Sequence, residues 1–110
     1  MNKVILIGRV GADPEKRGDN GPVVFSLATS EPAYSKADGT EVAEKTEWHS
    51  ITVFSEQPKR FVEKNFKKGS LVVIEGKIHY SSYTDAQGQA RKGVEIIASD
   101  ARFYSLGLSK

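Results

Sequence analysis

The only helix-like stretch of this chain lies between the third and the fourth of five strand-like stretches. The strand-like stretches are rich in β-branched and aromatic residues, and Gly, Pro, Asp or Asn residues bound them. They are residues 3–10, 23–30, 46–54, 71–83 and a last one that starts with 94–98 and continues, after an interruption, through 102–106. The helix-like stretch is residues 55–68. This order predicts an all-β fold with a small α content.

Five strands with one helix between strands 3 and 4 is the order of an OB-fold, a five-stranded Greek-key barrel. At 110 residues the chain can bury a core without disulfides, and it contains no cysteine. No internal repeat or linker divides it. We therefore expect a single OB-fold domain over residues 1–110, with a protruding hairpin around Asp38–Gly39.

The helix-like stretch has recognisable ends and one apolar face. Ser55 is expected to be the N-cap, and Gly69 suits the position just past the helix end. Lys59 belongs to the charged face, which is expected to meet solvent. The opposite face is expected to pack on the barrel through Phe61, Val62 and Phe66.

Side chains alternate between two faces along the third strand-like stretch. Ile51 and Val53 share one face with His49, and that face is typical of a core. Trp48 and Phe54 share the other face with two hydroxyl residues. Two large flat rings on a half-polar face serve either as additional core or as a platform for something flat.

The aromatic residues fall into two groups, according to whether they share a strand or helix face with apolar or with polar residues. Those in apolar phase are expected in the core: Phe25, Phe61, Phe66 and Tyr80. Those in polar phase, or on the polar segment 31–45, are expected at the surface: Trp48, Phe54, Tyr83 and Tyr34. Such rings can stack on nucleobases, because every base has a π-face. On pattern alone a patch for a partner protein explains them equally well.

Basic residues should run between the rings if a phosphate backbone follows the same path. The candidates are Lys3, Arg9, Lys36, Lys45, Lys68, Lys77, Arg91 and Lys92. The net charge of +2 and the pI near 8.9 permit a polyanionic partner without requiring one. A solvated lysine face is the ordinary alternative for each of them.

Nothing in the sequence indicates catalysis, a metal or a cofactor. Glu47 and His49 share a strand face, and a salt-bridged or interfacial pair explains them better than a catalytic dyad. His49 and His79 are the only histidines and make no metal site by themselves. The longest apolar run is far too short for a membrane span, and the first residues lack a secretory signal. We expect a cytoplasmic protein that is not an enzyme.

Several segments form a recognisable set that runs nearly end to end: Asn2–Gly8, Asp13–Glu15, Leu27–Ser30, Thr46–His49, Lys68–Gly76, Tyr83–Asp85 and Gly88–Gln89. Together they resemble the bacterial single-stranded DNA-binding protein family. The resemblance implies an OB-fold that binds single-stranded DNA without sequence preference in replication, recombination and repair, usually as a homotetramer.

The resemblance also implies roles for individual residues. Trp48 stands at the family's central stacking tryptophan, and Phe54 stands at its stacking phenylalanine. Tyr83 and Tyr34 fall at or near two further tryptophan positions. His49 matches a histidine at the subunit interface.

Three departures from the family modify these expectations. A tyrosine ring overlaps a base less than tryptophan does, so we expect weaker binding per ring at Tyr34 and Tyr83. Ser81–Ser82 replace residues that are often basic in relatives, which should flatten the salt dependence. The sequence ends at 106–110 without an acidic tail. It is expected to be a truncated or tail-less member without tail-mediated protein partners, acting at the nucleoid or, if phage- or plasmid-encoded, in the host cytoplasm.

Two alternatives keep the same fold. One is a primosome-type accessory protein that contacts a helicase. The other is a protein-interaction module that uses the ring face for a peptide, because an OB-fold alone does not fix function.

Overall fold

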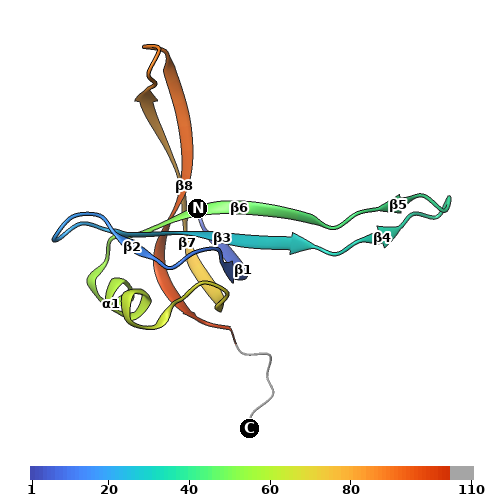
Figure 1. Ribbon diagram of the computed structural model, residues 1–110, viewed down its shortest axis with the longest axis horizontal. Helices are drawn as coiled ribbons and strands as arrows, with labels where there is room; N and C mark the ends of the chain where they lie inside the picture. Colours follow the sequence, from blue (N-terminus) through green and yellow to red (C-terminus); the bar gives the residue numbers. More distant parts are fainter. Residues whose placement is uncertain (105–110) are drawn as a thin grey trace, which may run out of the picture.

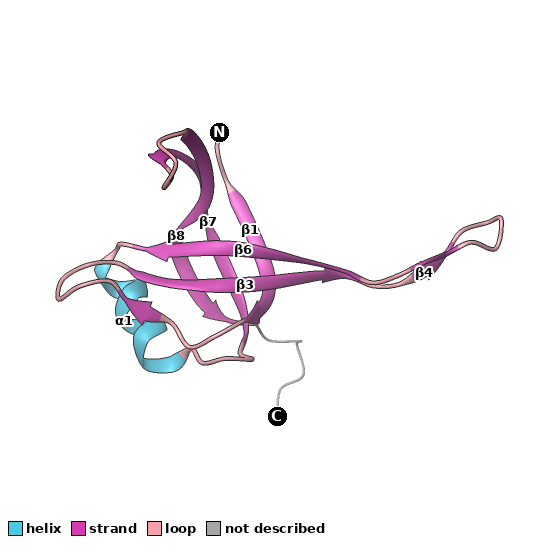
Figure 2. Ribbon diagram, turned by 45° about the horizontal axis from the view of Figure 1, so that its top comes forward, coloured by secondary structure: helices cyan, strands magenta, loops and turns pink. Residues whose placement is uncertain are grey.

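A computed structural model describes residues 1–104 as a closed β-barrel with one helix and two projecting arms (Figures 1 and 2). The long strands are β1 (Val4–Val10), β3 (Val23–Glu31), β6 (Lys45–Val53), β7 (Leu71–Thr84) and β8 (Ala90–Phe103). The short elements are β2 (Glu15–Lys16), β4 (Tyr34–Ser35), β5 (Glu41–Val42) and the helix α1 (Glu56–Asn65).

Strand β1 closes the barrel. The strands follow one another in the order β1-β7-β8-β6-β3-β2, and β1 also pairs with β3. The pairing of β6 with β8 is parallel, and the other pairings in this sheet are antiparallel. Helix α1 lies between the third and fourth long strands. The predicted OB-fold is therefore confirmed.

Alternate side chains of the strands fill the barrel. Phe25 and Leu27 of β3 and Ile51 and Val53 of β6 are buried, which confirms the core face predicted for β6 and the core position predicted for Phe25. Helix α1 covers one end of the barrel, where the ring of Phe66 meets that of Phe25 edge-on at 5.9 Å. On the opposite face of β6, Thr52 is buried but Trp48 is exposed to solvent.

Two hairpin arms continue beyond the barrel. Strands β3 and β6 lead into the short β4–β5 pair, which is the predicted hairpin around Asp38–Gly39. Strand β6 reaches β8 only at Ile96–Ala98. Within the described residues, the outer halves of β7 and β8 therefore pair only with each other. Figure 1 shows the two arms leaving the barrel in different directions.

Helix α1 is shorter than predicted. Ser55 occupies the N-cap position, but its side chain makes no capping hydrogen bond. Phe66 follows the helix in an extended conformation with its ring buried, so Gly69 lies in a later turn rather than at the helix end. Residues 1–104 form this one helix, and it is too short and too polar to cross a membrane.

Lys59 is buried, although the sequence placed it on the solvent face. Its ammonium lies 3.1 Å from a Glu56 carboxylate oxygen and donates to the Gly21 carbonyl at 3.2 Å. The hydrogen bond and charge of Lys59 lower the pKa of Glu56. These partners offset the cost of burying the cation, and helical periodicity could not reveal them because Gly21 lies on a distant loop.

The core position predicted for Tyr80 is wrong. Tyr80 is 70% exposed and Ile78 is 36% exposed, because β7 has left the barrel by this point. Strand β8 begins at Ala90, four residues before the prediction, and Ser99 forms the interruption as a bulge opposite the Glu75/Gly76 step. The predicted extension of this strand to Leu106 lies partly outside the described residues.

Candidate nucleic-acid interface

The four rings predicted at the surface are all exposed. The exposed fractions are 63% for Trp48, 54% for Phe54, 55% for Tyr83 and 57% for Tyr34. More than half of the surface of each residue is therefore accessible to a ligand. None of the four belongs to the buried core, so the alternative of additional core is excluded for them.

The rings lie on separate parts of the molecule. Trp48 stands near the point where β6 leaves the barrel, and Phe54 directly follows the same strand. Tyr34 lies on β4 in one arm, and Tyr83 lies on β7 in the other (Figure 1). The molecule measures 52 × 49 × 29 Å. A compact ligand cannot reach rings on both arms and the barrel, whereas a flexible polymer can.

Two small residues, Gly11 and Ala28, lie against the Trp48 ring, and we call them the seat of the ring. Ala28 of β3 is its partner across the sheet. Gly11 follows β1 and donates its backbone N–H to the Ser26 carbonyl at 2.9 Å. A Cβ atom on Gly11 would lie 2.5 Å from Cζ3 of Trp48 and 2.6 Å from Oγ of Ser26. The indole therefore occupies space that any other residue at position 11 would fill.

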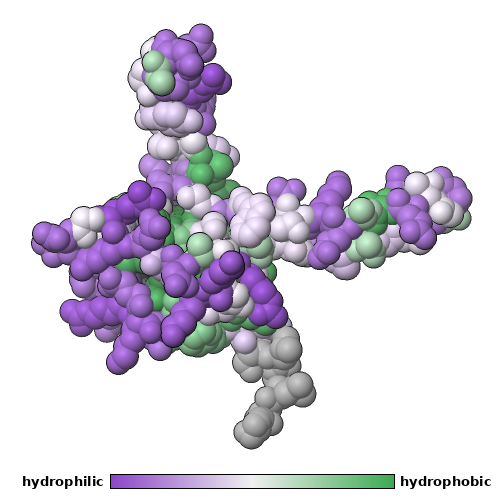
Figure 3. All heavy atoms as spheres, in the orientation of Figure 1, coloured by the Kyte–Doolittle hydropathy of each residue, from purple (hydrophilic) through white to green (hydrophobic). Residues whose placement is uncertain are grey.

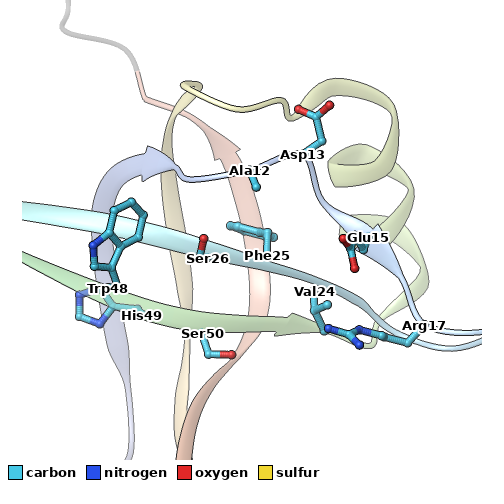
Figure 4. A pocket seen from close by; sticks show the side chains of 10 residues that line it. All are labelled: Ala12, Asp13, Glu15, Arg17, Val24, Phe25, Ser26, Trp48, His49 and Ser50. Atoms are coloured by element: carbon cyan, nitrogen blue, oxygen red, sulfur yellow. The ribbon is translucent and has the colours of Figure 1, made fainter.

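A hollow of about 400 Å³ opens beside Trp48 between strands β3 and β6 and the segment that follows β1. Figure 4 shows Trp48 at one end of this hollow and Arg17 at the other, with the hydroxyls of Ser26 and Ser50 between them. Asp13 lines its rim, and its carboxylate accepts the backbone N–H of Lys68 at 2.8 Å. The hollow thus combines a flat ring, hydroxyl groups and the cation of Arg17 with the carboxylates of Asp13 and Glu15.

His49 lies on the core side of β6 and is half-buried. Its Nε2 lies 2.8 Å from Oγ1 of Thr29 on the neighbouring strand. This bond fixes the imidazole without an acidic partner, so the structure gives no support to the Glu47–His49 dyad. Within residues 1–104, no group of His, Asp and Glu side chains could hold a metal ion. The predicted role of His49 at a subunit interface stays a prediction.

Three of the candidate cations already have partners in the chain. The Lys3 ammonium lies 3.3 Å from a Glu75 carboxylate oxygen. The Arg9 guanidinium donates to the Gly69 carbonyl at 2.9 Å. The third, Arg91, forms an ion pair within its own arm. Lys3 and Arg9 must give up or share these contacts to bind a phosphate, so the sequence overestimated their availability.

Five candidate lysines make no ion pair within the part of the chain that the structure describes. They are Lys36, Lys45, Lys68, Lys77 and Lys92. All five are exposed. Lys36 and Lys45 follow the arm that carries Tyr34, and Lys92 lies on the arm that carries Tyr83, whereas Lys77 lies opposite Ile97 within the barrel. Cations therefore accompany the rings along both arms.

Arg91 is held next to Tyr83 by the turn of the β7–β8 arm. Its Nε lies 2.8 Å from Oδ2 of Asp85. The other oxygen of Asp85 accepts the backbone N–H groups of Gln87 and Gln89 at 3.0 and 2.9 Å. The Arg91 hydrogen bond, followed by these amides, lowers the pKa of Asp85. The carboxylate competes with any phosphate for Arg91.

Asp85→Asn should release Arg91 without opening the turn. An asparagine keeps one oxygen for the two backbone N–H groups and loses the charge that holds Arg91. One added phosphate contact should steepen the slope of log Kobs against log salt by about 0.7 for a single strand. Titrations of oligo-dT at several salt concentrations measure this slope. An unchanged slope would show that Arg91 faces no phosphate.

Sequence reasoning missed two residues beside these rings. Gly11 supports Trp48 only through the β1–β3 contact, and no local pattern reveals that contact. The apolar phase of the stretch predicted over 71–83 assigns Tyr80 to the core, but this stretch is longer than the about 3–10 residues usual for strands in globular proteins. The length of the predicted strand was the signal that its end projects from the barrel.

Comparisons with known proteins agree with this fold. The model of the single-strand binding protein family matches residues 1–104. A single-stranded DNA-binding protein of Bacteroides thetaiotaomicron is 44% identical over 96% of this chain and 66% of its own length. The mitochondrial single-stranded DNA-binding protein of Bos taurus is 40% identical over 96% of this chain and 76% of its own length.

A solved structure shares the arrangement of the chain as well. The Plasmodium falciparum SSB in complex with ssDNA superposes with a TM-score of 0.84 at 32% identity, and the match covers 96% of both chains. The family match over nearly the whole chain, the relatives above 30% identity and this structure all lead to one assignment. The chain belongs to the single-strand binding protein family.

Proposed function

We propose that this protein binds single-stranded DNA without sequence preference and protects it during replication, recombination and repair. The observation that carries the proposal is the exposed Trp48 ring on its seat of small residues. Trp48 lies on a path with other exposed rings and unpaired lysines on both arms. The similarity to single-stranded DNA-binding proteins supports the same function.

Binding requires no covalent chemistry. Unpaired bases stack on Trp48, Phe54, Tyr83 and Tyr34, and each stacked base contributes about 1–3 kcal/mol. Lysine ammonium groups neutralise phosphates and release the counterions that had condensed on the DNA. Stacking accepts any base because every base has a π-face. The protein therefore recognises the unpaired state of the strand rather than its sequence.

Duplex DNA should bind much more weakly than a single strand, because its base faces are already covered by neighbouring bases. Fluorescence anisotropy of end-labelled oligo-dT, and of the same strand annealed to oligo-dA, measures this selectivity at one salt concentration. We expect tight binding of the single strand and weak, salt-sensitive binding of the duplex. Equal affinity for the two forms would contradict stacking as the basis of recognition.

We further propose that the protein assembles as a homotetramer. One edge of β1 pairs with β7, but its other edge meets β3 only at Arg9 and Val10 within the described residues. An unpaired edge is a template for a strand from another copy. Ile5 and Ile7 of β1 are exposed in the single chain, which supports burial between subunits. Light scattering should give four times the chain mass of 12.1 kDa.

A dimer in the same measurement would instead favour the primosome-type accessory protein. The place of action that we propose is the cytoplasm, at the nucleoid, or the host cytoplasm for a phage- or plasmid-encoded protein. The bacterial relatives from Bacteroides thetaiotaomicron and Rhizobium meliloti support this placement.

A further inference from the structure

Tyr80 has the most exposed ring among residues 1–104, and the proposed stacking on the other four rings does not use it. It lies on the outer half of β7, beyond the barrel, and Val94 of β8 is its partner across the arm. Ile78 and Val94 next to it are also exposed. Figure 3 shows apolar side chains gathered where this arm leaves the barrel.

Tyr80 and Tyr83 lie on opposite faces of the β7–β8 arm. Side chains alternate along a strand, so Tyr83 shares its face with its partner Arg91. Tyr80 shares the other face with Ser82, and the partner of Ser82 is Lys92. Lys92 makes no ion pair with any described residue. A flat ring and a free cation therefore lie in adjacent positions on the face away from Tyr83.

Two adjoining hollows connect Trp48 to this ring and cation. The first, of about 310 Å³, is lined by Trp48 and Tyr80 together, with Val94 between the barrel and the arm. The second, of about 340 Å³, is lined by Tyr80, Ser82 and Lys92. Tyr80 borders both hollows. A strand that leaves Trp48 can thus follow the arm past Tyr80 to Lys92.

We propose that Tyr80 and Lys92 form a further nucleotide subsite next to Trp48, in which a base stacks on Tyr80 and Lys92 binds a phosphate. The subsite rests on the proposed function, because it extends the path of the same strand. The free cation favours a nucleic acid over a second copy of the chain, since an apolar interface would bury the Lys92 charge without a partner.

One carboxylate borders the proposed path. Glu95 lines the first hollow, but the hydroxyl of Thr52 donates a hydrogen bond to it. Glu95 is the partner of His79 across the arm, so the alternation of side chains puts both on the face of Tyr83 rather than on that of Tyr80. The position beside Tyr80 that a phosphate would occupy is therefore bordered by Lys92 and Ser82, and no carboxylate lines this second hollow among the described residues.

A tryptophan at position 80 would report stacking directly. In Trp48→Phe, which keeps a ring at position 48, the further change Tyr80→Trp leaves one indole in the protein, at the proposed subsite. Saturation with oligo-dT should quench its fluorescence. Unchanged fluorescence at saturation, with binding established by labelled oligo-dT, would overturn the subsite.

Affinity provides the second test, with a conservative variant as control. Tyr80→Leu keeps an apolar side chain but removes the ring, and it should weaken oligo-dT binding about tenfold, whereas Tyr80→Phe should bind like the natural chain. Lys92→Gln should flatten the salt slope by about 0.7, and Lys64→Gln on α1 should leave it unchanged. Equal affinity of Tyr80→Leu and Tyr80→Phe would overturn the proposal.

The oligomeric state separates the alternatives. Light scattering of Tyr80→Leu should give the mass of the natural assembly, and a lower mass would assign this face to a second copy instead. Different results would refute the proposed subsite and the proposed function. If Trp48→Ala weakens binding and Tyr80→Leu does not, only the subsite is wrong. If neither variant affects binding, stacking on Trp48 is wrong as well, and if the natural chain itself does not bind oligo-dT, the proposed function is wrong.

Discussion

Replacing Trp48 with alanine should weaken oligo-dT binding by about 5- to 150-fold, which corresponds to the loss of one stacked base at about 1–3 kcal/mol. We expect the upper part of this range. Tyrosine occupies two of the other ring positions, and its smaller ring overlaps a base less than indole does. Anisotropy of labelled oligo-dT at fixed salt measures the change.

Stability and sequence preference are the controls for this variant. Trp48 is 63% exposed and outside the core, so Trp48→Ala should leave the thermal midpoint nearly unchanged. The loss of affinity should be similar for oligo-dT, oligo-dC and mixed sequences, because stacking accepts any base. A loss confined to one base would indicate direct readout of sequence, and an unchanged affinity would remove Trp48 from the interface.

Gly11→Val should reduce binding nearly as much as the loss of Trp48 itself. The added Cβ would lie 2.5 Å from the indole, which must then leave its seat between Gly11 and Ala28. Gly11 does not adopt a left-handed conformation, so valine is excluded by the indole and by Ser26 rather than by the backbone. We expect a decrease in affinity of about 10- to 100-fold, measured with the same labelled oligonucleotide.

The double variant is the matched control for Gly11. In the Trp48→Ala background the indole is absent, so Gly11→Val should have little further effect on affinity. Such non-additivity would show that Gly11 acts by positioning Trp48. If Gly11→Val costs the same in both backgrounds, the glycine contacts the DNA itself or supports the barrel, and its role as a seat for the indole is wrong.

The alternation of β6 explains why the sequence predicted so much of this molecule. A strand period of two is strict where one face is buried, so Ile51 and Val53 had to face the core and Trp48 had to face away. The same rule failed on β7. It placed Tyr80 inside because the apolar phase continues, but the barrel ends before Tyr80 and both faces of the arm meet solvent.

The cations were less predictable than the rings. Lys3 pairs with Glu75, and Arg9 binds the Gly69 carbonyl, across the pairing of β1 with the distant strand β7. Local sequence cannot show such contacts. Ring exposure follows from strand phase, whereas the availability of a cation depends on which acceptors the fold brings near it.

The fluorescence of Trp48 during titration with oligo-dT at low salt tests the central claim, base stacking on this ring, most directly. Trp48 is the single tryptophan of the chain, so the signal reports this ring alone. We expect saturable quenching that added salt reverses as phosphate contacts are lost. Fluorescence that stays constant while labelled oligo-dT binds would show that DNA does not stack on Trp48, and the proposed binding mode would be wrong.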